Sequence, residues 1–260
     1  GIKVMSRILA FGDSFVLGDL DDFGPGDFNY NPKFPPTHDM QLDERIEFLK
    51  TNVSFAALLS KKLEYDLLNF SLRGCSNFIQ LDKLINFIIA GKLKPDDVIL
   101  FGLTTINRDR LSLLFDLHEN KSEVVRIVDY EIQASNNWEI LQKIDYFYIL
   151  SILNQISVKY NVPIIKFNLF TNEMKDPPSL LDYHSDNFIG LDVNNNTLID
   201  VLNDTWGSSS FIENVYHTDI KVPAGYEHLY TWNRHPSIEG HKKIADWFFD
   251  IIDWDNLKNG

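Results

Sequence analysis

The segment "RILAFGDSFVLGD", residues 7–19, places a short apolar run directly before Gly12-Asp13-Ser14. An apolar run of this length is typical of a buried strand in a parallel sheet. A serine at the end of such a strand can present its hydroxyl and its backbone N–H in the same crevice. Two interpretations of Ser14 follow: it is a nucleophile, or it is a polar residue that caps the next turn.

Apolar runs and helical patterns alternate along the rest of the chain. Further runs with the length of a buried strand lie at residues 65–71, 96–103 and 162–170. Helical patterns lie at residues 54–63, 76–93, 139–160 and 236–254. This alternation predicts an α/β fold in which helices cover both faces of a parallel sheet. Such sheets place their sites in loops past the carboxyl ends of the strands, where Ser14, Gly74 and Thr104 are expected.

The two longer helical patterns predict which side chains face the core. In residues 139–160, helical spacing selects a stripe made of Ile140, Ile144, Phe147, Ile152 and Ile156. In residues 236–254, Ser237 is expected to cap the helix. One side of that helix is expected to carry Ile244, Trp247, Phe248 and Ile251.

Two segments break the alternation, at residues 19–48 and at about 171–231. They are rich in Asp, Asn, Pro and aromatic residues, and we interpret both as insertions that could form the wall of a substrate cleft. There is no internal repeat and no low-complexity linker, so residues 1–260 are expected to form a single domain.

Composition excludes several classes of partner. The chain has 24 Lys and Arg against 37 Asp and Glu, a net charge of −13, which disfavours nucleic acid and anionic membrane surfaces. A single cysteine excludes an internal disulfide and a cysteine-based zinc cluster. No stretch is long and apolar enough for a membrane span, and the opening "GIKVMSR" does not resemble a secretory signal. These features predict a soluble, cytoplasmic protein.

The segment "WNRHPSIEG", residues 232–240, places His235 immediately before Pro236 at the entrance of the last helix. A rigid loop of this kind suits a general base, which needs a fixed position within hydrogen-bond reach of the nucleophile. His241 lies inside the helix and is expected to be an ordinary packed or exposed residue. A second loop, in "NFSLRGCSN" at residues 69–77, contains Gly74, which would let the backbone approach another group closely.

Taken in order, these segments resemble the blocks of the SGNH or GDSL hydrolase family of esterases and acylhydrolases. The resemblance implies that Ser14 attacks an ester carbonyl, that the N–H groups of Ser14 and Gly74 bind the oxyanion, and that His235 is the base. It also implies a flavodoxin-like three-layer α/β/α sandwich with a parallel sheet of roughly five strands, and catalysis without a metal or an organic cofactor. The substrate would be an acyl or acetyl ester.

The third block departs from the family pattern. It normally reads Gly-x-Asn, and its Asn is a further oxyanion donor, but here Gly102-Leu103 is followed by Thr104. Thr104 could donate through its hydroxyl, and Asn77 or Asn107 could supply an amide. We favour Asn77, because it opens a helix at the edge of the expected site.

The last block also departs, because Trp232 stands where the family has the Asp that orients the histidine. Asn233 could accept a hydrogen bond from the imidazole through its side-chain oxygen. Asp219, Glu227 and a backbone carbonyl are the alternatives.

The sequence therefore predicts a serine esterase that forms an acyl-enzyme. A carbohydrate ester is the favoured type of substrate, because aromatic residues of the two insertions could bind a sugar: Tyr30, Phe34, Trp206, Tyr226 and Tyr230. The rival interpretation is a binding protein on the same scaffold that lost catalysis with the two missing residues. A nucleotide-binding protein is disfavoured, because no phosphate-binding loop occurs. The distance between the Ser14 hydroxyl and His235 discriminates between enzyme and binding protein.

Overall fold

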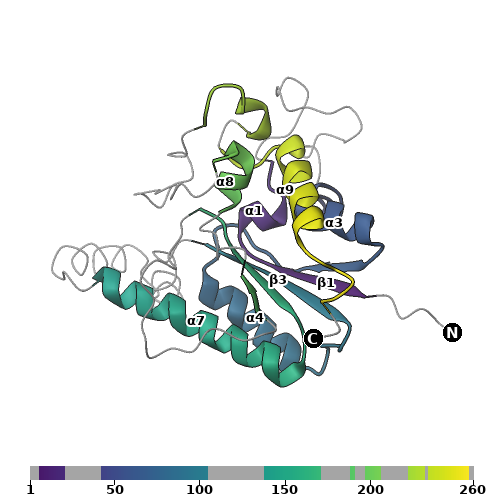
Figure 1. Ribbon diagram of the computed structural model, residues 1–260, viewed down its shortest axis with the longest axis vertical. Coiled ribbons are helices and arrows are strands. Elements are labelled where there is room, and N and C mark those ends of the chain that lie inside the picture. Colours follow the sequence, from purple (N-terminus) through teal and green to yellow (C-terminus); the bar gives the residue numbers. More distant parts are fainter. Residues whose placement is uncertain are drawn as a thin grey trace.

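The structure, a computed structural model, describes residues 6–20, 42–104, 138–170, 188–190, 197–205, 222–231 and 234–257. Within these ranges a parallel five-stranded sheet lies between two layers of helices (Figure 1). The predicted three-layer α/β/α sandwich is thereby confirmed. The strands are β1 (Arg7–Phe11), β2 (Asp66–Asn69), β3 (Asp97–Leu103), β4 (Ile164–Asn168) and β5 (Phe188–Gly190).

The strand order is β2-β1-β3-β4-β5, which is the flavodoxin-like order. β1 pairs with β3 from Arg7 opposite Asp97 to Phe11 opposite Phe101. The chain leaves β1 toward β2 on one side and later returns to β3 on the other. The carboxyl ends of β1 and β3 therefore flank the point where the winding reverses, and ligands of open α/β sheets bind in that crevice.

The two faces of the sheet are covered by different helices (Figure 1). One apolar cluster joins α1 (Ser14–Leu17), α3 (Phe55–Leu63), α8 (Leu198–Asn203) and α9 (Ile238–Ile251) to strand residues such as Ile8 and Ala10. The other joins α4 (Asn77–Ile89) and α7 (Trp138–Tyr160) to Leu9 and Phe11. Alternate residues of β1 thus face opposite layers, as the period of a strand requires. None of the helices within the described ranges is both long enough and apolar enough to cross a membrane.

Serine side chains cap the first turn of three of these helices. Ser54 accepts the N–H of Ala57 at the start of α3, and Ser76 accepts that of Ile79 at the start of α4. The predicted cap of the last helix is confirmed, because Ser237 accepts the N–H of Gly240. Three shorter elements complete the described structure: α2 (Leu42–Phe48), η2 (Leu49–Val53) and η5 (Glu227–Leu229).

The predicted core-facing stripes are partly wrong. Ile144 of α7 is 45% exposed and Ile251 of α9 is 46% exposed, whereas both were expected to face the core. The buried stripe of α7 is rotated and consists of Tyr146, Phe147, Ile149, Leu150, Leu153 and Ile156. Apolar residues occur all around this helix, so the pattern alone allowed more than one face. The side chain of Ile140 lies outside the described residues.

Part of the range 171–231, predicted to be an insertion, supplies elements of the core. β5 extends the sheet beside β4, with Ile164 opposite Phe188. α8 is buried along its whole length. Short apolar runs such as "FIG" and "LIDVLN" were too brief to be recognised among the surrounding polar residues.

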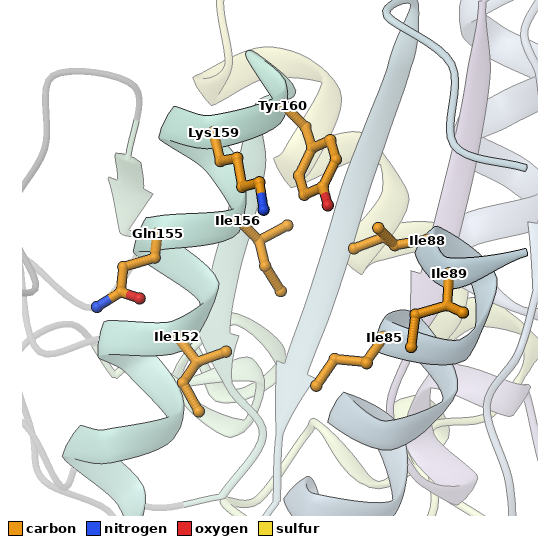
Figure 2. A pocket seen from close by; sticks show the side chains of 8 residues that line it. All are labelled: Ile85, Ile88, Ile89, Ile152, Gln155, Ile156, Lys159 and Tyr160. Atoms are coloured by element: carbon orange, nitrogen blue, oxygen red, sulfur yellow. The ribbon is translucent and has the colours of Figure 1, made fainter. Parts of the chain in front are cut away.

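A groove of about 210 Å³ lies between α4 and α7, with a mostly aliphatic lining that includes Ile85, Ile89 and Ile152 (Figure 2). α4 and α7 end here, and the chain then enters β3 and β4. The groove is therefore at the amino ends of the strands, opposite the edge that carries Ser14.

The starts of β1 and β3 are joined by an ion pair. Two guanidinium nitrogens of Arg7 donate to the two carboxylate oxygens of Asp97, each at 2.7 Å. Asp97 is fully buried, and its carboxylate also accepts the N–H of Lys94. Because these residues face each other across the two strands, the pair stabilises the register on which the site depends.

We expect Arg7→Met to lower the free energy of unfolding by about 3 kcal/mol, because it leaves a buried carboxylate without its cation. Lys62→Met is the matched control, since it breaks a pair with Asp246 in which both side chains are about 40% exposed. That change should cost less than about 1 kcal/mol. Urea unfolding of the three proteins measures both values, and equal costs would contradict the prediction.

Candidate active site

The turn after β1 presents Ser14 as the first residue of α1. Asp13 caps this helix, and its Oδ1 accepts the N–H of Phe15 at 2.9 Å. Gly12 permits the tight packing beneath the helix, because a Cβ at this position would lie 2.2 Å from Cγ2 of Val16. At the other end Gly18 closes the helix in the left-handed conformation, with φ of 92°. The short helix therefore holds Ser14 at the carboxyl end of the central strand.

The loop before α9 fixes His235. The N–H of Thr231 donates to the carbonyl of His235 at 2.8 Å, and the N–H of His235 donates back to the Thr231 hydroxyl at 3.2 Å. On the other side of Pro236, the N–H of Ser237 donates to the carbonyl of Leu229. Main-chain bonds on both sides of the histidine therefore restrict the position of its ring.

The structure brings Ser14 and His235 together from positions 221 residues apart. Nε2 of His235 lies 2.9 Å from Oγ of Ser14, which is hydrogen-bond distance. Both residues are buried, at 6% and 3% exposure. The ring of Phe15 packs beside the imidazole, with 5.3 Å between the centroids. A neutral imidazole in this place can take the serine proton as the hydroxyl attacks an electrophile.

The segment that carries His235 is attached to α8. The hydroxyl of Tyr230 donates to Oδ1 of Asn203 at 2.7 Å, and burial raises the pKa of this tyrosine. Nearby, Asp204 accepts from the Tyr226 hydroxyl and from Lys243, and the bond from Lys243 is the main cause of the lowered pKa of Asp204. Tyr230 is fully buried, so it packs the structure and does not form the sugar-binding surface predicted for it.

The loop that contains Gly74 is bonded to the turn that carries Ser14. The N–H of Leu72 donates to the carbonyl of Gly12 at 3.1 Å. Arg73 donates from two nitrogens to the carboxylate of Asp19, whose own N–H donates to the carbonyl of Ser14. Gly74 has φ of +61°, and a Cβ added there would meet nothing within 4 Å. The contacts of Leu72 and Arg73 attach this loop to the turn that carries Ser14, and the oxyanion role of Gly74 stays a prediction.

Cys75 follows Gly74 and is the second nucleophilic side chain of this region. It is buried, and its thiol donates to the carbonyl of Gly12. Burial raises its pKa to about 11. The residue is therefore a neutral thiol at neutral pH and does not compete with the serine hydroxyl.

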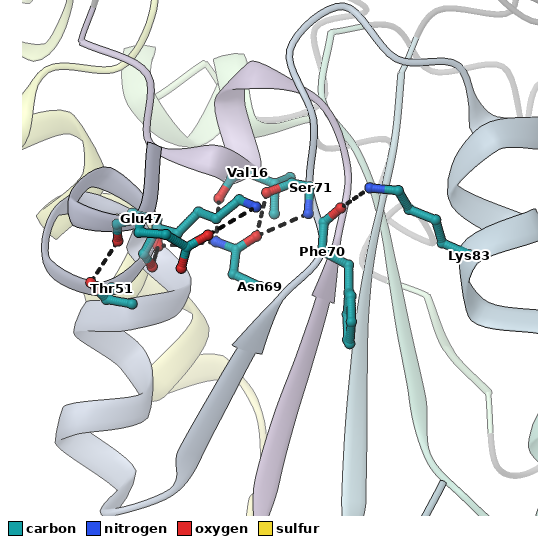
Figure 3. Close-up of polar contacts among 9 residues, drawn as sticks. Val16, Glu47, Thr51, Asn69, Phe70, Ser71 and Lys83 are labelled. Carbon is teal, nitrogen blue, oxygen red and sulfur yellow. Dashed lines mark hydrogen bonds and ion pairs between the residues drawn. The ribbon is translucent and has the colours of Figure 1, made fainter. Parts of the chain in front are cut away.

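Asn69, at the end of β2, is hydrogen-bonded to α1 (Figure 3). Its Nδ2 donates to the carbonyl of Val16 at 3.2 Å, and its Oδ1 accepts from both the N–H and the hydroxyl of Ser71. Lys83 of α4 donates to the carbonyl of Phe70 between them. The end of β2 is thereby attached to α1 and to α4.

Asn77 and Thr104, the two predicted side-chain donors, bond to each other. Oδ1 of Asn77 accepts the N–H of Thr104 at 2.8 Å, and its Nδ2 donates to the Thr104 carbonyl at 3.1 Å. The Thr104 hydroxyl donates to Oδ2 of Asp13 at 2.9 Å. These contacts place both residues beside the nucleophile turn, and direct donation to an oxyanion stays a prediction for each.

The identity of the residue that orients His235 stays a prediction. Asn233, Trp232 and Asp219 lie outside the described residues, as does Asn107. Glu227 is exposed, and its carboxylate accepts the N–H of Gly225. That contact directs the Glu227 carboxylate toward the turn at Gly225. Among the residues that the structure describes, no cluster of His, Cys, Asp or Glu is suited to a metal ion.

Asp13 has two structural roles that its place in the Gly-Asp-Ser tripeptide does not by itself reveal. Asp13 is a helix cap and the acceptor for Thr104. An Asp one residue before a helix is a recognised capping signal, so its first role was accessible from the sequence. The pairing of Arg73 with Asp19 had no such signal, because the two residues are 54 positions apart.

The other histidine of this region, His241, does not contact Ser14 and is fully buried in α9. Its Nδ1 accepts the N–H of Phe55 at 3.3 Å, so the proton of the neutral ring is on Nε2. Burial, and to a smaller degree the neighbouring His235, lowers the pKa of His241 to about 3. It is the packed helical residue that was expected.

Because the unfolded chain protonates His241 near pH 6.5 and the folded protein does so only near pH 3, stability is lost as the pH falls through this window. The loss due to this residue should reach about 2 kcal/mol at pH 5. His241→Gln keeps an acceptor for Phe55 and removes the titration. Urea unfolding of both proteins at pH 8 and pH 5 should show the smaller loss in the variant, and parallel losses would refute the assignment.

Comparisons with known proteins complete the description of the site. No protein-family model matches the chain, and no curated protein sequence matches it. Solved structures do resemble it. One is a G-D-S-L family protein from Desulfitobacterium hafniense DCB-2, with 14% identity, a TM-score of 0.49 and coverage of 95% of this chain and 99% of the other.

Two further solved structures resemble the chain to a similar degree. An alpha/beta hydrolase enzyme from the metagenome of Lake Arreo has 17% identity and a TM-score of 0.46, over 94% of this chain and 93% of its own. An acetylxylan esterase from Geobacillus stearothermophilus has 16% identity and a TM-score of 0.46, over 96% and 95%. The fold class itself is defined by the strand order.

Proposed function

We propose that the chain is a serine esterase that cleaves an acyl or acetyl ester through a covalent acyl-enzyme. The observation that carries the proposal is the separation of 2.9 Å between Oγ of Ser14 and Nε2 of His235. A structural serine or histidine does not need a partner of this kind in a buried crevice at the carboxyl ends of two central strands. The contact supports the enzyme over a binding protein on the same scaffold.

In the first half of the reaction, Oγ of Ser14 attacks the ester carbonyl carbon while its proton passes to Nε2 of His235. The carbonyl π electrons move to the oxygen, which becomes an oxyanion. The C–O bond to the alcohol then breaks, and the alcohol leaves with the proton from His235. In the second half, water attacks the acyl-enzyme, His235 again takes and returns the proton, and the acid is released.

We expect the backbone N–H groups of Ser14 and Gly74 to bind the oxyanion. Ser14 is the first residue of α1, and the first N–H groups of a helix have no acceptor within the helix. Gly74 lies on a loop that is bonded to the same turn through Leu72 and Gly12. Backbone donors that are fixed in advance stabilise a developing charge without reorganisation. Carbohydrate esters are the first substrates to test, as the sequence favours them.

A fluorophosphonate probe should label Ser14 in the native protein at neutral pH, because such probes capture a serine hydroxyl beside a neutral imidazole. Ser14→Ala should abolish both the labelling and the hydrolysis of a small acetate ester. His235→Gln should reduce both by at least about 10³-fold, because the base is lost while the oxyanion donors remain. Mass spectrometry of the labelled peptide and initial rates measure the two effects.

Thermal unfolding of the same variants is the control, since each must unfold near the temperature of the parent protein for its loss of activity to count. A folded parent protein that neither reacts with the probe nor hydrolyses any simple ester contradicts the proposal. That outcome favours the binding protein.

For the orienting residue we propose Asn233, whose place two residues before His235 is the only support for this role. Asn233→Asp would add a negative charge beside the imidazolium that forms during attack. We expect a higher kcat on an activated ester, and an acid limb of the pH–rate profile that moves to higher pH, because the carboxylate favours the protonated ring. An unchanged rate and profile would assign the role to another group, such as Asp219 or a backbone carbonyl.

A further inference from the structure

Thr104 is hydrogen-bonded to Asp13, the residue that caps α1. Its hydroxyl donates to Oδ2 of Asp13 at 2.9 Å, and the other oxygen of that carboxylate, Oδ1, accepts the N–H of Phe15. Asp13 is fully buried and Thr104 is 4% exposed. The carboxylate thus joins the end of β3 to the residue that follows Ser14.

Asn77 fixes the position of Thr104. Its carboxamide bonds to both the N–H and the carbonyl of Thr104, in the way that a neighbouring strand would. Asn77 is fully buried at the start of α4. Through Asn77, α4 therefore holds the backbone of Thr104, the first residue after β3. The Thr104 hydroxyl is hydrogen-bonded to Asp13 at this point.

We propose that Thr104 is a positioning residue of the esterase: held by Asn77, it fixes the Asp13 carboxylate so that α1 keeps Oγ of Ser14 within reach of Nε2 of His235. The inference rests on the function proposed above. It assigns Asn77 and Thr104 to the support of the nucleophile, and it leaves the oxyanion to the backbone N–H groups of Ser14 and Gly74.

The chemistry of a buried carboxylate supports this role. A charge removed from water needs donors on its oxygens, and a hydrogen bond to a carboxylate is stronger than one between two neutral groups. Without the hydroxyl, Oδ2 of Asp13 loses this donor, and we expect the carboxylate to hold its cap on Phe15 less firmly. Catalysis is sensitive to such movements, since a misplacement of about 1 Å can cost about 10²-fold in rate.

Thr104→Val tests the proposal, because it removes the hydroxyl with little change of shape, and Thr104→Ser is the matched variant that keeps it. For an activated acetate ester we expect the valine variant to lose about ten- to a hundredfold in kcat, with KM within about twofold of the parent value. Labelling of Ser14 by the fluorophosphonate should slow by a similar factor. The serine variant should retain the parent kcat, and an equal loss in both variants overturns the proposal.

A double-mutant cycle separates positioning from direct donation to the oxyanion. If the hydroxyl acts through Asp13, then Thr104→Val has no further effect on kcat in an Asp13→Ala background. If the hydroxyl donates to the oxyanion, Thr104→Val lowers kcat by the same factor in both backgrounds. That result overturns the proposal. Should Asp13→Ala not fold, Asp13→Asn takes its place, since it keeps an oxygen for the cap.

Amide hydrogen exchange at Phe15 tests the network without any activity. Exchange should be faster in Thr104→Val than in the parent protein and unchanged in Thr104→Ser, because only the valine variant loosens the cap. If the parent protein is inactive toward esters and probe, the proposed function fails, and so does the esterase role that rests on it. If the parent is active while Thr104→Val changes neither kcat nor exchange, only the positioning role fails.

Discussion

The close packing of α1 on the sheet is the constraint on which the rest of the site depends. Val16 fills the space over two glycines, and a Cβ on Gly102 would lie 2.8 Å from its Cγ2 and 3.0 Å from the ring of Phe167. Larger residues at these places would lift the helix off the carboxyl ends of β1 and β3. Ser14 would then move away from Nε2 of His235, which lies 2.9 Å from its Oγ.

Much of this arrangement follows from short-range patterns. The apolar runs predicted four strands, because a strand buried on both faces reads as a continuous apolar segment. Ser237 marked the start of the last helix, and Pro236 marked the fixed loop of His235. Parallel strands bring their carboxyl ends to one edge, so the neighbourhood of Ser14, Gly74 and Thr104 could be predicted before any distance was known.

The rest depended on contacts that no local pattern encodes. Apolar residues occur all around α7, so the exposed position of Ile144 is decided by the sheet beneath the helix. β5 has only three residues, and its strand character comes from pairing with β4. The bonds from Thr104 to Asp13 and from Arg73 to Asp19 join residues 91 and 54 positions apart. Such pairs are settled by the tertiary structure, and a single sequence shows them only as separate polar residues.

Because 221 positions separate Ser14 and His235, we expect the contact between them to form late in folding. A contact that closes so long a loop forms only after the intervening strands have lowered the entropy cost of bringing its ends together. His235 lies directly before α9, and this helix packs on Phe55 and on the apolar face of the sheet beside it. Chemical competence is thereby coupled to burial of the last helix, so a partly folded chain presents Ser14 without the group that would make it reactive.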